Sequence, residues 1–220
     1  MAGSTGLVGS ELLSLLLADP ACTAVHALLR KHPAQLPNSP ALPPKLHLHV
    51  VDFALLPTSP ALPACDRVYI ALGTTIKVAG SQEAFRRVDV DAVVAVARAA
   101  RTTGASRLAL VSALGAHPNS RTFYNRAKGD AEAAVTSLGF ARVVIAQPSL
   151  ILGDRSPLGQ PERTGEAWAQ RLLRPIRGLI PRSVRPIEAS AIAAAMHAAM
   201  QSGEPGVQRL VSGAMLASAP

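Results

Sequence analysis

Short apolar segments alternate with helical patterns along the whole chain, and this alternation restricts the possible folds more than any other feature. The expected strands are 24–29, 46–51, 67–72, 108–111 and 142–146, and the expected helices are 10–18, 89–103, 124–138 and 189–201. Strands that alternate with helices pair in parallel and are covered by those helices. We therefore expect an α/β protein with a three-layer, doubly wound parallel sheet of the Rossmann type.

The composition agrees with a buried parallel sheet. Hydrophobic residues make up 49% of the chain and aromatic residues only 3%, so Ala, Val and Leu must form the core. Buried parallel strands between Ala-rich helices have this composition. A length of 220 residues is typical of one domain. We expect a single domain over 1–220, in which the irregular stretch 154–186 is an insertion on the substrate side.

The start of the chain does not fit a complete sheet of this type. A doubly wound sheet needs a strand before its first glycine turn, but only Met1 and Ala2 precede Gly3. The sheet either has a gap where this strand belongs, or the natural start lies several residues upstream. A gap would leave ladder groups unpaired, at about 1–3 kcal/mol for each buried group. A missing N-terminal segment is therefore the simpler account.

Charge and apolar runs limit the classes of partner. No apolar run reaches the roughly 18 residues that cross a bilayer, and no secretory signal begins the chain. We expect no membrane contact and a cytoplasmic protein. The net charge of +8 comes from dispersed basic residues without interleaved aromatics, which argues against nucleic acid as a partner. The arginines within 154–186 could instead line a pocket for an anionic small-molecule substrate, and a protein partner stays open.

A glycine-rich motif opens the first helix. It reads Gly3-Ser4-Thr5-Gly6-Leu7-Val8-Gly9. Glycines let the backbone approach a pyrophosphate, and free N–H groups at a helix N-terminus favour its negative charge. A plain turn between strand and helix is the alternative. The position at the first turn of a βα chain favours a dinucleotide.

The end of the next strand bears on cofactor choice. Sheets that prefer NAD carry an acidic residue there to hold the ribose hydroxyls. This strand instead ends at Arg30 and Lys31. Two cations would attract the 2′-phosphate, so we expect NADP(H) to be preferred over NAD(H). The alternative is an ordinary basic strand end.

Three residues form a candidate catalytic group. Tyr124 and Lys128 lie four residues apart on a predicted helix and so share one face. A neighbouring ammonium stabilises a phenolate, which allows a tyrosine to act as acid and base. Ser112, at the end of the preceding strand, could hold a substrate carbonyl. No metal site is expected, because His47 and His49 share a strand face without a third ligand nearby.

Several segments, in order, resemble the atypical short-chain dehydrogenase/reductases. These segments are GSTGLVG, ALGTT, FRRVD, VSALGA, FYNRAKGDAE and QPSLILG. The branch that looks most similar is the Tat-interacting-protein-like oxidoreductases with an NAD(P)-binding Rossmann domain, including their bacterial homologues. The resemblance extends from Gly3 to about Met200.

This resemblance implies roles for individual residues. Tyr124 would be the general acid/base, Lys128 its modifier and ribose anchor, and Ser112 would orient the carbonyl. The residues implied around the cofactor are Gly3, Ser4, Thr5, Gly6, Leu7, Val8 and Gly9 at the pyrophosphate, Arg30 at the adenosine phosphate, Asp52 by the adenine, Leu72 and Gly73 under the adenosine ribose, and Pro148, Ser149 and Leu150 along the nicotinamide.

Two functions remain open at this point. The first is an NADP(H)-dependent oxidoreductase that acts on a small carbonyl or alcohol by hydride transfer, with the tyrosine as acid and base. The second is a catalytically silent NADP(H)-binding redox sensor or regulatory protein. Both need the same cofactor site, because fold alone does not decide chemistry.

Overall fold

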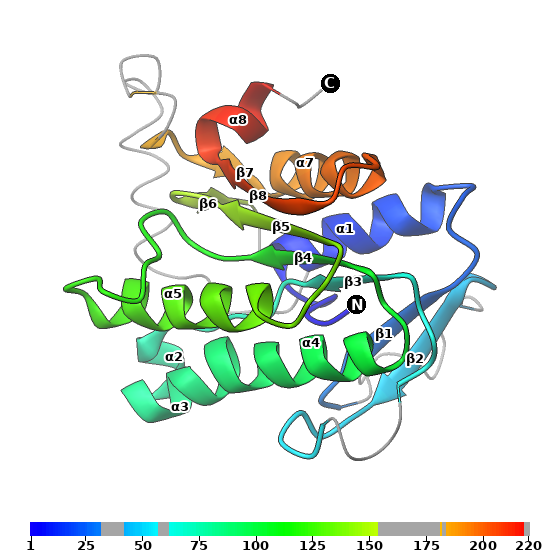
Figure 1. Cartoon of the computed structure of the whole chain (residues 1–220), viewed down its shortest axis with the longest axis horizontal. Coiled ribbons are helices and arrows are strands. Elements are labelled where there is room, and N and C mark those ends of the chain that lie inside the picture. Colours follow the sequence, from blue (N-terminus) through cyan, green and yellow to red (C-terminus); the bar gives the residue numbers. More distant parts are fainter. Residues whose placement is uncertain (32–41, 57–61, 154–180, 182–183, 218–220) are drawn as a thin grey trace.

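The computed structural model describes residues 1–31, 42–56, 62–153, 181 and 184–217 of the chain (Figure 1). The elements in chain order are α1 (Leu7–Ala18), β1 (Val25–Leu29), β2 (Leu46–Val50), β3 (Arg67–Ile70), α2 (Ile76–Ala79), α3 (Gln82–Arg86), the π-helical turn η1 (Arg87–Asp91), α4 (Ala92–Thr102), β4 (Arg107–Val111), α5 (Phe123–Thr136), β5 (Arg142–Gln147), β6 (Ile151–Leu152), β7 (Ile187–Glu188), α7 (Ala189–Gln201), β8 (Gly206–Val211) and α8 (Ser212–Ala217).

β6 pairs with β7 in a separate two-stranded parallel sheet, and the other strands form one parallel arrangement with a narrow join near its middle. β1 pairs with β2, and β3, β4, β5 and β8 follow one another in that order, every pair being parallel. Ala2 connects the two parts through parallel bridges to Leu28 and Ile70. The doubly wound parallel sheet predicted from the sequence is confirmed, and Met1 and Ala2 lie between β1 and β3.

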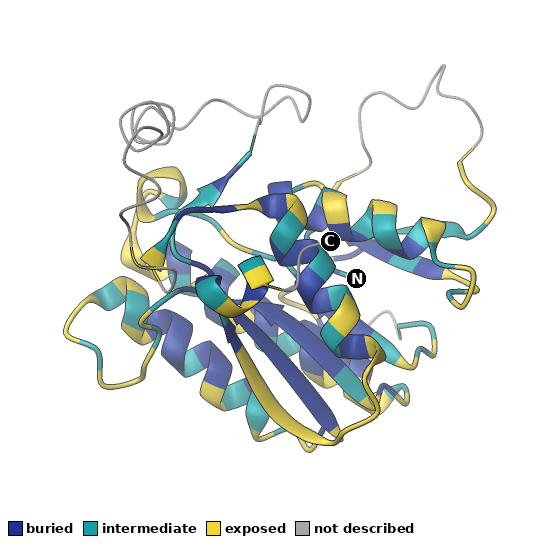
Figure 2. Ribbon diagram, turned by 90° about the horizontal axis from the view of Figure 1, so that it is seen from above, coloured by how far each residue is buried: buried dark blue, intermediate teal, exposed yellow. Residues whose placement is uncertain are grey.

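Helices cover both faces of this sheet (Figures 1 and 2). Alternate strand residues point to opposite faces, so Leu108 packs in one buried cluster and Ala109 in the other. The first cluster includes Val93 and Val96 of α4, and the second includes Leu12 of α1 together with residues of α7. The core is therefore two apolar layers separated by the sheet.

Edge elements and one helix start differ from the sequence prediction. β8 was not predicted, because four of its six residues are exposed and it shows no apolar run. The helix predicted over 89–103 belongs to a longer helical stretch that begins at Gln82 and contains η1. Most of the predicted insertion over 154–186 lies outside the described residues, and the single-domain assignment stays a prediction.

The part of the chain that the structure describes contains no helix that is both long and apolar enough to span a membrane.

Gly129 of α5 has no room for a side chain, and this close approach is testable. A Cβ at this position would lie 2.2 Å from the carbonyl carbon of His117. We expect Gly129→Ala to lower the free energy of unfolding by about 1–3 kcal/mol, because backbone would have to move. Gly203→Ala is the control, since a Cβ there meets no atom within 4 Å. Denaturant unfolding of both variants measures the difference, and equal stabilities would contradict the close packing.

Candidate functional site

The predicted site residues lie along the carboxyl edge of the sheet. In a parallel sheet all strands end at the same edge, and ligands bind in the crevice outside it. The glycine turn follows Ala2, Gly73 follows β3, Ser112 follows β4 and Pro148 follows β5. The loops are in contact, since Leu114 donates its N–H to the Pro148 carbonyl at 2.8 Å.

The glycine turn contains two positions where only glycine fits. Gly3 has a φ of +90°, and a Cβ there would lie 2.5 Å from the Ala71 carbonyl. A Cβ on Gly9 would lie 1.8 Å from the Gly3 oxygen. Gly6 caps α1 without a side-chain hydrogen bond, so no side chain of the cap competes for the first N–H groups of the helix. The turn therefore fits a pyrophosphate, because the backbone can approach the phosphate groups closely and the first N–H groups of α1 can donate hydrogen bonds to them.

A buried ion pair lies beside Gly73. The Lys128 ammonium is 2.7 Å from Asp89 Oδ1, and their side chains are 7% and 0% exposed. Asp89 Oδ2 also accepts the Thr74 N–H at 2.9 Å. A Cβ on Gly73 would approach both charged groups, at 3.4 Å from Asp89 Oδ1 and 3.8 Å from Lys128 Nζ. The absence of a side chain at Gly73 thus keeps the end of β3 open beside Lys128.

The carboxylate of this pair comes from the π-helical turn η1. A π-turn is rare and is found frequently at functional sites. Asp89 is buried within it, and the helical stretch that contains this turn begins at Gln82. The sequence reading missed Asp89 as a partner of Lys128, although it belongs to the FRRVD segment of the family resemblance.

Tyr124 lies in the first turn of α5, one turn before Lys128. Tyr124 is 37% exposed, whereas Lys128 is buried. The ring centroid is 5.5 Å from that of Phe85, which is fully buried in α3. Tyr124 is thus held by an aromatic contact while part of its side chain reaches solvent.

Ser112 belongs to a buried polar cluster that the sequence did not reveal. Its hydroxyl donates to Glu132 Oε1 at 2.5 Å, and Gln147 Nε2 donates to the same oxygen at 2.8 Å. Arg209 Nε lies 3.4 Å from Glu132 Oε2. A serine hydroxyl has one proton to donate, so in this arrangement it is not available to a substrate carbonyl. A spacing of four residues from Lys128 to Glu132 was the available signal.

The remaining predicted cofactor residues occupy the same edge with varied exposure. Arg30 and Asp52 are exposed after β1 and β2, and Asp52 accepts the Ala54 N–H at 2.9 Å. Pro148 is buried, whereas Ser149 and Leu150 are partly buried. Ser149 and Ser212 are joined through their hydroxyls at 3.1 Å.

The other predicted cofactor residues lie in the glycine turn and after β3. Ser4, Leu7 and Val8 are buried, whereas Thr5 is exposed. Leu72, after β3, is partly buried. The cofactor contacts of all these residues stay predictions.

A histidine cluster lies on β1 and β2. His26 Nδ1 is 2.9 Å from His49 Nε2, and the rings of His26 and His47 are stacked with centroids 5.0 Å apart. Burial, followed by repulsion from neighbouring histidines, lowers the pKa of His26 and His49. The sequence reading missed His26 as a neighbour of His47 and His49. Even so, no group of three or more His, Cys, Asp or Glu side chains among the described residues is placed to hold a metal ion.

The buried pair at the site gives a stability prediction. Asp89→Ala leaves the Lys128 ammonium buried and unpaired, and we expect the free energy of unfolding to fall by about 3–5 kcal/mol. Glu83→Ala breaks an exposed pair, in which Arg87 and Glu83 are 61% and 83% exposed. This control should change stability by no more than about 0.5 kcal/mol. Similar losses in both variants, measured by urea unfolding, would argue against a buried pair.

Comparison with curated proteins identifies related sequences. The profile of the NAD(P)H-binding family matches residues 3–165. The mitochondrial protein fmp52 of Emericella nidulans is 34% identical over 169 residues, which cover 76% of this chain and 71% of that protein. FMP52 of Candida albicans is 32% identical over 79% of this chain and 80% of its own length. FMP52 of Eremothecium gossypii is 38% identical over 70% of this chain, which spans only 66% of that relative.

These relatives correct the expected localisation and add fungal proteins to the expected bacterial homologues. They are named mitochondrial proteins, which contradicts the cytoplasmic localisation. The physical reason for the error is that a missing secretory signal says nothing of the Arg-rich, amphipathic signals of mitochondrial import. The relatives are fungal, whereas the resemblance pointed to bacterial homologues.

Solved structures share the fold. MoeE5 in complex with UDP-glucuronic acid and NAD superposes with a TM-score of 0.70 and 18% identity, over 95% of this chain and 74% of that one. The UDP-N-acetylglucosamine 4-epimerase of Methanobrevibacter ruminantium M1 superposes with a TM-score of 0.68 and 16% identity, over 96% and 74%. With the family match over residues 3–165, the chain belongs to the NAD(P)H-binding family, has its Rossmann-like fold and is related to the FMP52 proteins.

Proposed function

We propose that the protein is an NADP(H)-dependent oxidoreductase that transfers hydride between the nicotinamide and a small carbonyl or alcohol. The observation that carries this proposal is the buried Lys128–Asp89 pair beside Gly73, at the same sheet edge as the glycine turn. A buried ion pair is seldom retained for stability alone, because desolvation offsets most of its attraction. Its place at the cofactor edge supports a functional role for Lys128.

The roles of the side chains follow from their positions on α5. When bound, the cofactor supplies or accepts the hydride. Tyr124 transfers the proton to or from the substrate oxygen, and the ammonium of Lys128 one turn away stabilises the phenolate. Asp89 fixes the direction of the Lys128 ammonium. Tyr124 is partly exposed, which gives a substrate access to the phenol.

Cofactor preference rests on the end of β1. Arg30 and Lys31 are both exposed there, and a phosphate accepts charge-assisted hydrogen bonds from such groups. A carboxylate, the usual partner of the NAD ribose, is missing from this strand end. The 2′-phosphate of NADP(H) therefore has partners that NAD(H) cannot use.

The charge of the chain also bears on the substrate. A net charge of +8 favours anionic small molecules over cationic ones. The arginine-rich stretch expected to line the substrate pocket lies largely outside the described residues, so its contribution stays a prediction.

A second function is favoured by the Ser112 contact. The Ser112 hydroxyl is bonded to Glu132 at 2.5 Å, so a substrate carbonyl would lack this donor. A redox sensor that binds NADP(H) without turnover needs no such donor. Turnover in the presence of a bound cofactor distinguishes the two functions.

Tyrosine substitution tests the proposed chemistry. Tyr124→Phe should reduce turnover of any carbonyl substrate by at least about a hundred-fold, because general acid–base catalysis contributes on that order or more. NADPH binding, measured by calorimetry, should stay nearly unchanged. Tyr69→Phe is the matched control, since Tyr69 is a buried tyrosine of β3 and burial raises its pKa to about 12.

The outcomes separate the two functions. Equal turnover in Tyr124→Phe would reject the tyrosine mechanism. NADPH binding without turnover in the unmodified protein, across a panel of aldehydes and ketones, would favour the sensor.

Charge removal at β1 tests the cofactor preference. We expect the double variant Arg30→Ala with Lys31→Ala to weaken NADPH binding by about ten-fold or more and leave NADH binding unchanged. Each charge-assisted hydrogen bond contributes about 1.5–3 kcal/mol, and about 1.4 kcal/mol is ten-fold. Arg98→Ala, an exposed cation of α4, should change neither affinity. Calorimetry with both nucleotides gives the ratio, and an unchanged ratio would contradict the assignment.

A further inference from the structure

The buried polar cluster leaves the proposed reaction without its expected donor to the substrate oxygen. Hydride addition to a carbonyl carbon moves the π electron pair onto the oxygen, and hydrogen-bond donors aimed at that oxygen stabilise the charge that develops. The sequence predicts Ser112 as such a donor. Its hydroxyl instead donates to Glu132 Oε1 at 2.5 Å, so the reaction needs another donor near Tyr124.

The side-chain donors of Gln147 and Ser149, at the end of β5, are committed as well. Gln147 Nε2 donates to both oxygens of Glu132, at 2.8 and 3.1 Å. The Ser149 hydroxyl donates to the Arg185 carbonyl at 2.6 Å. A side-chain amide has two N–H donors and a hydroxyl has one, so each of these donors already has a partner inside the protein.

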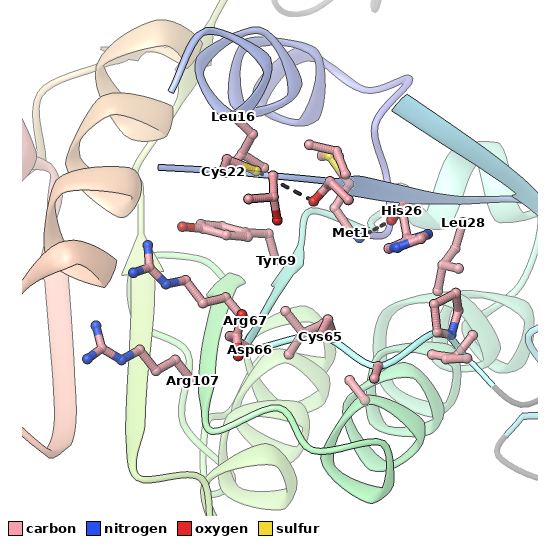
Figure 3. A pocket seen from close by; sticks show the side chains of 18 of the residues that line it. Met1, Leu16, Cys22, His26, Leu28, Cys65, Asp66, Arg67, Tyr69 and Arg107 are labelled. Carbon is pink, nitrogen blue, oxygen red and sulfur yellow. Dashed lines mark hydrogen bonds between the residues drawn. The ribbon is translucent and has the colours of Figure 1, made fainter. Parts of the chain in front are cut away.

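A cavity of about 420 Å³ lies at the other edge of the sheet and adds no donor to this one (Figure 3). Arg67 and Arg107, which begin β3 and β4, are among its lining residues. The cavity therefore lies towards the amino ends of these strands, whereas Ser112 and Pro148 follow the carboxyl ends of β4 and β5. A donor near Tyr124 has to come from α5 or from the loop before it.

Asn125 carries side-chain donors that have no partner. It follows Tyr124 in the first turn of α5 and is half-buried. Its side-chain amide makes no hydrogen bond within the part of the chain that the structure describes, and neither of its polar atoms is fully enclosed. Both N–H donors of this amide are therefore available to a ligand.

The loop after β4 sets the position of the Asn125 amide. A Cβ on Gly115 would lie 3.1 Å from Asn125 Nδ2, so the amide lies directly beside a residue that has no side chain. Gly115 has a φ of +77°, which favours glycine at this position. The His117 N–H donates to the Asn125 carbonyl at 3.0 Å. This bond holds the loop against the first turn of α5.

Tyr124 and Asn125 lean towards the same edge of the sheet. Side chains of an α-helix tilt towards its N-terminus, and α5 begins after the loop that follows β4. The first turn of α5 therefore directs both side chains towards the carboxyl edge. Successive helix positions differ by about 100° around the axis, so the phenol and the amide approach an oxygen at this edge from two directions.

We propose that Asn125 orients the substrate carbonyl by donating an amide N–H to the oxygen that Tyr124 protonates. This assignment rests on the proposed oxidoreductase activity. As the carbonyl carbon gains a hydride from the reduced nicotinamide, the carbonyl oxygen takes the proton of Tyr124, and solvent returns a proton to the phenolate. Asn125 keeps its own protons throughout. Its hydrogen bond strengthens as charge develops on the oxygen.

Substitutions that remove the amide donors test this assignment. Asn125→Asp keeps the shape of the side chain and suits the first turn of a helix, where a carboxylate is favourable. Asn125→Ala removes the donors without adding charge. We expect both variants to lower kcat for a carbonyl substrate by about a hundred-fold, the loss expected on removal of one donor to a developing oxyanion. NADPH binding should stay nearly unchanged. Asn119→Asp, at an exposed loop position, is the charge control and should keep full activity.

A complex that cannot react tests the hydrogen bond without turnover. A ketone or aldehyde bound beside NADP⁺ is not reduced, so infrared spectroscopy can record its C=O stretch. The probes are cyclohexanone, benzaldehyde and phenylglyoxylate. In the unmodified protein and in Ser112→Ala, we expect the bound carbonyl to absorb at a lower frequency than the free compound. In Asn125→Asp and Asn125→Ala the frequency should move back towards that of the free compound.

The two readouts separate this assignment from the proposed function. A frequency that depends on Asn125, in a protein that turns over none of the probes with NADPH, would reject the oxidoreductase and support the donor site. Three results would overturn the assignment of Asn125: equal kcat in Asn125→Ala and the unmodified protein, a frequency that moves in Ser112→Ala but not in Asn125→Ala, or no binding of any probe beside NADP⁺.

Discussion

The pairing of Ala2 with β3 is the contact on which the geometry of the cofactor edge depends. Two hydrogen bonds, from Ala2 to the Tyr69 carbonyl and from Ala71 to the Ala2 carbonyl, hold the residue that precedes the glycine turn. They bring Gly3 so close to Ala71 that no side chain fits between them. The start of α1, and with it the direction of its free N–H groups, follows from this contact.

Buried charges organise the other side of the same edge. Lys128 and Glu132 occupy one face of α5, and each is buried against a partner from a distant part of the chain. Asp89 neutralises Lys128, while Ser112 and Gln147 donate to Glu132. Burial makes an unpaired charge costly, so these contacts fix the rotation of α5 relative to β4 and β5. The position of Tyr124 on α5 is a consequence of that fixed rotation.

The sequence predicted what depends on local pattern and missed what depends on distant partners. The apolar runs of β1, β4 and β5 and the glycines of the first turn each have a local cause, and the structure contains the elements they indicate. Asp89 and Glu132 have partners in other elements, so no local pattern reveals which residues they pair with. The π-turn that buries Asp89 has no composition signal, and the exposed strand β8 shows no apolar run.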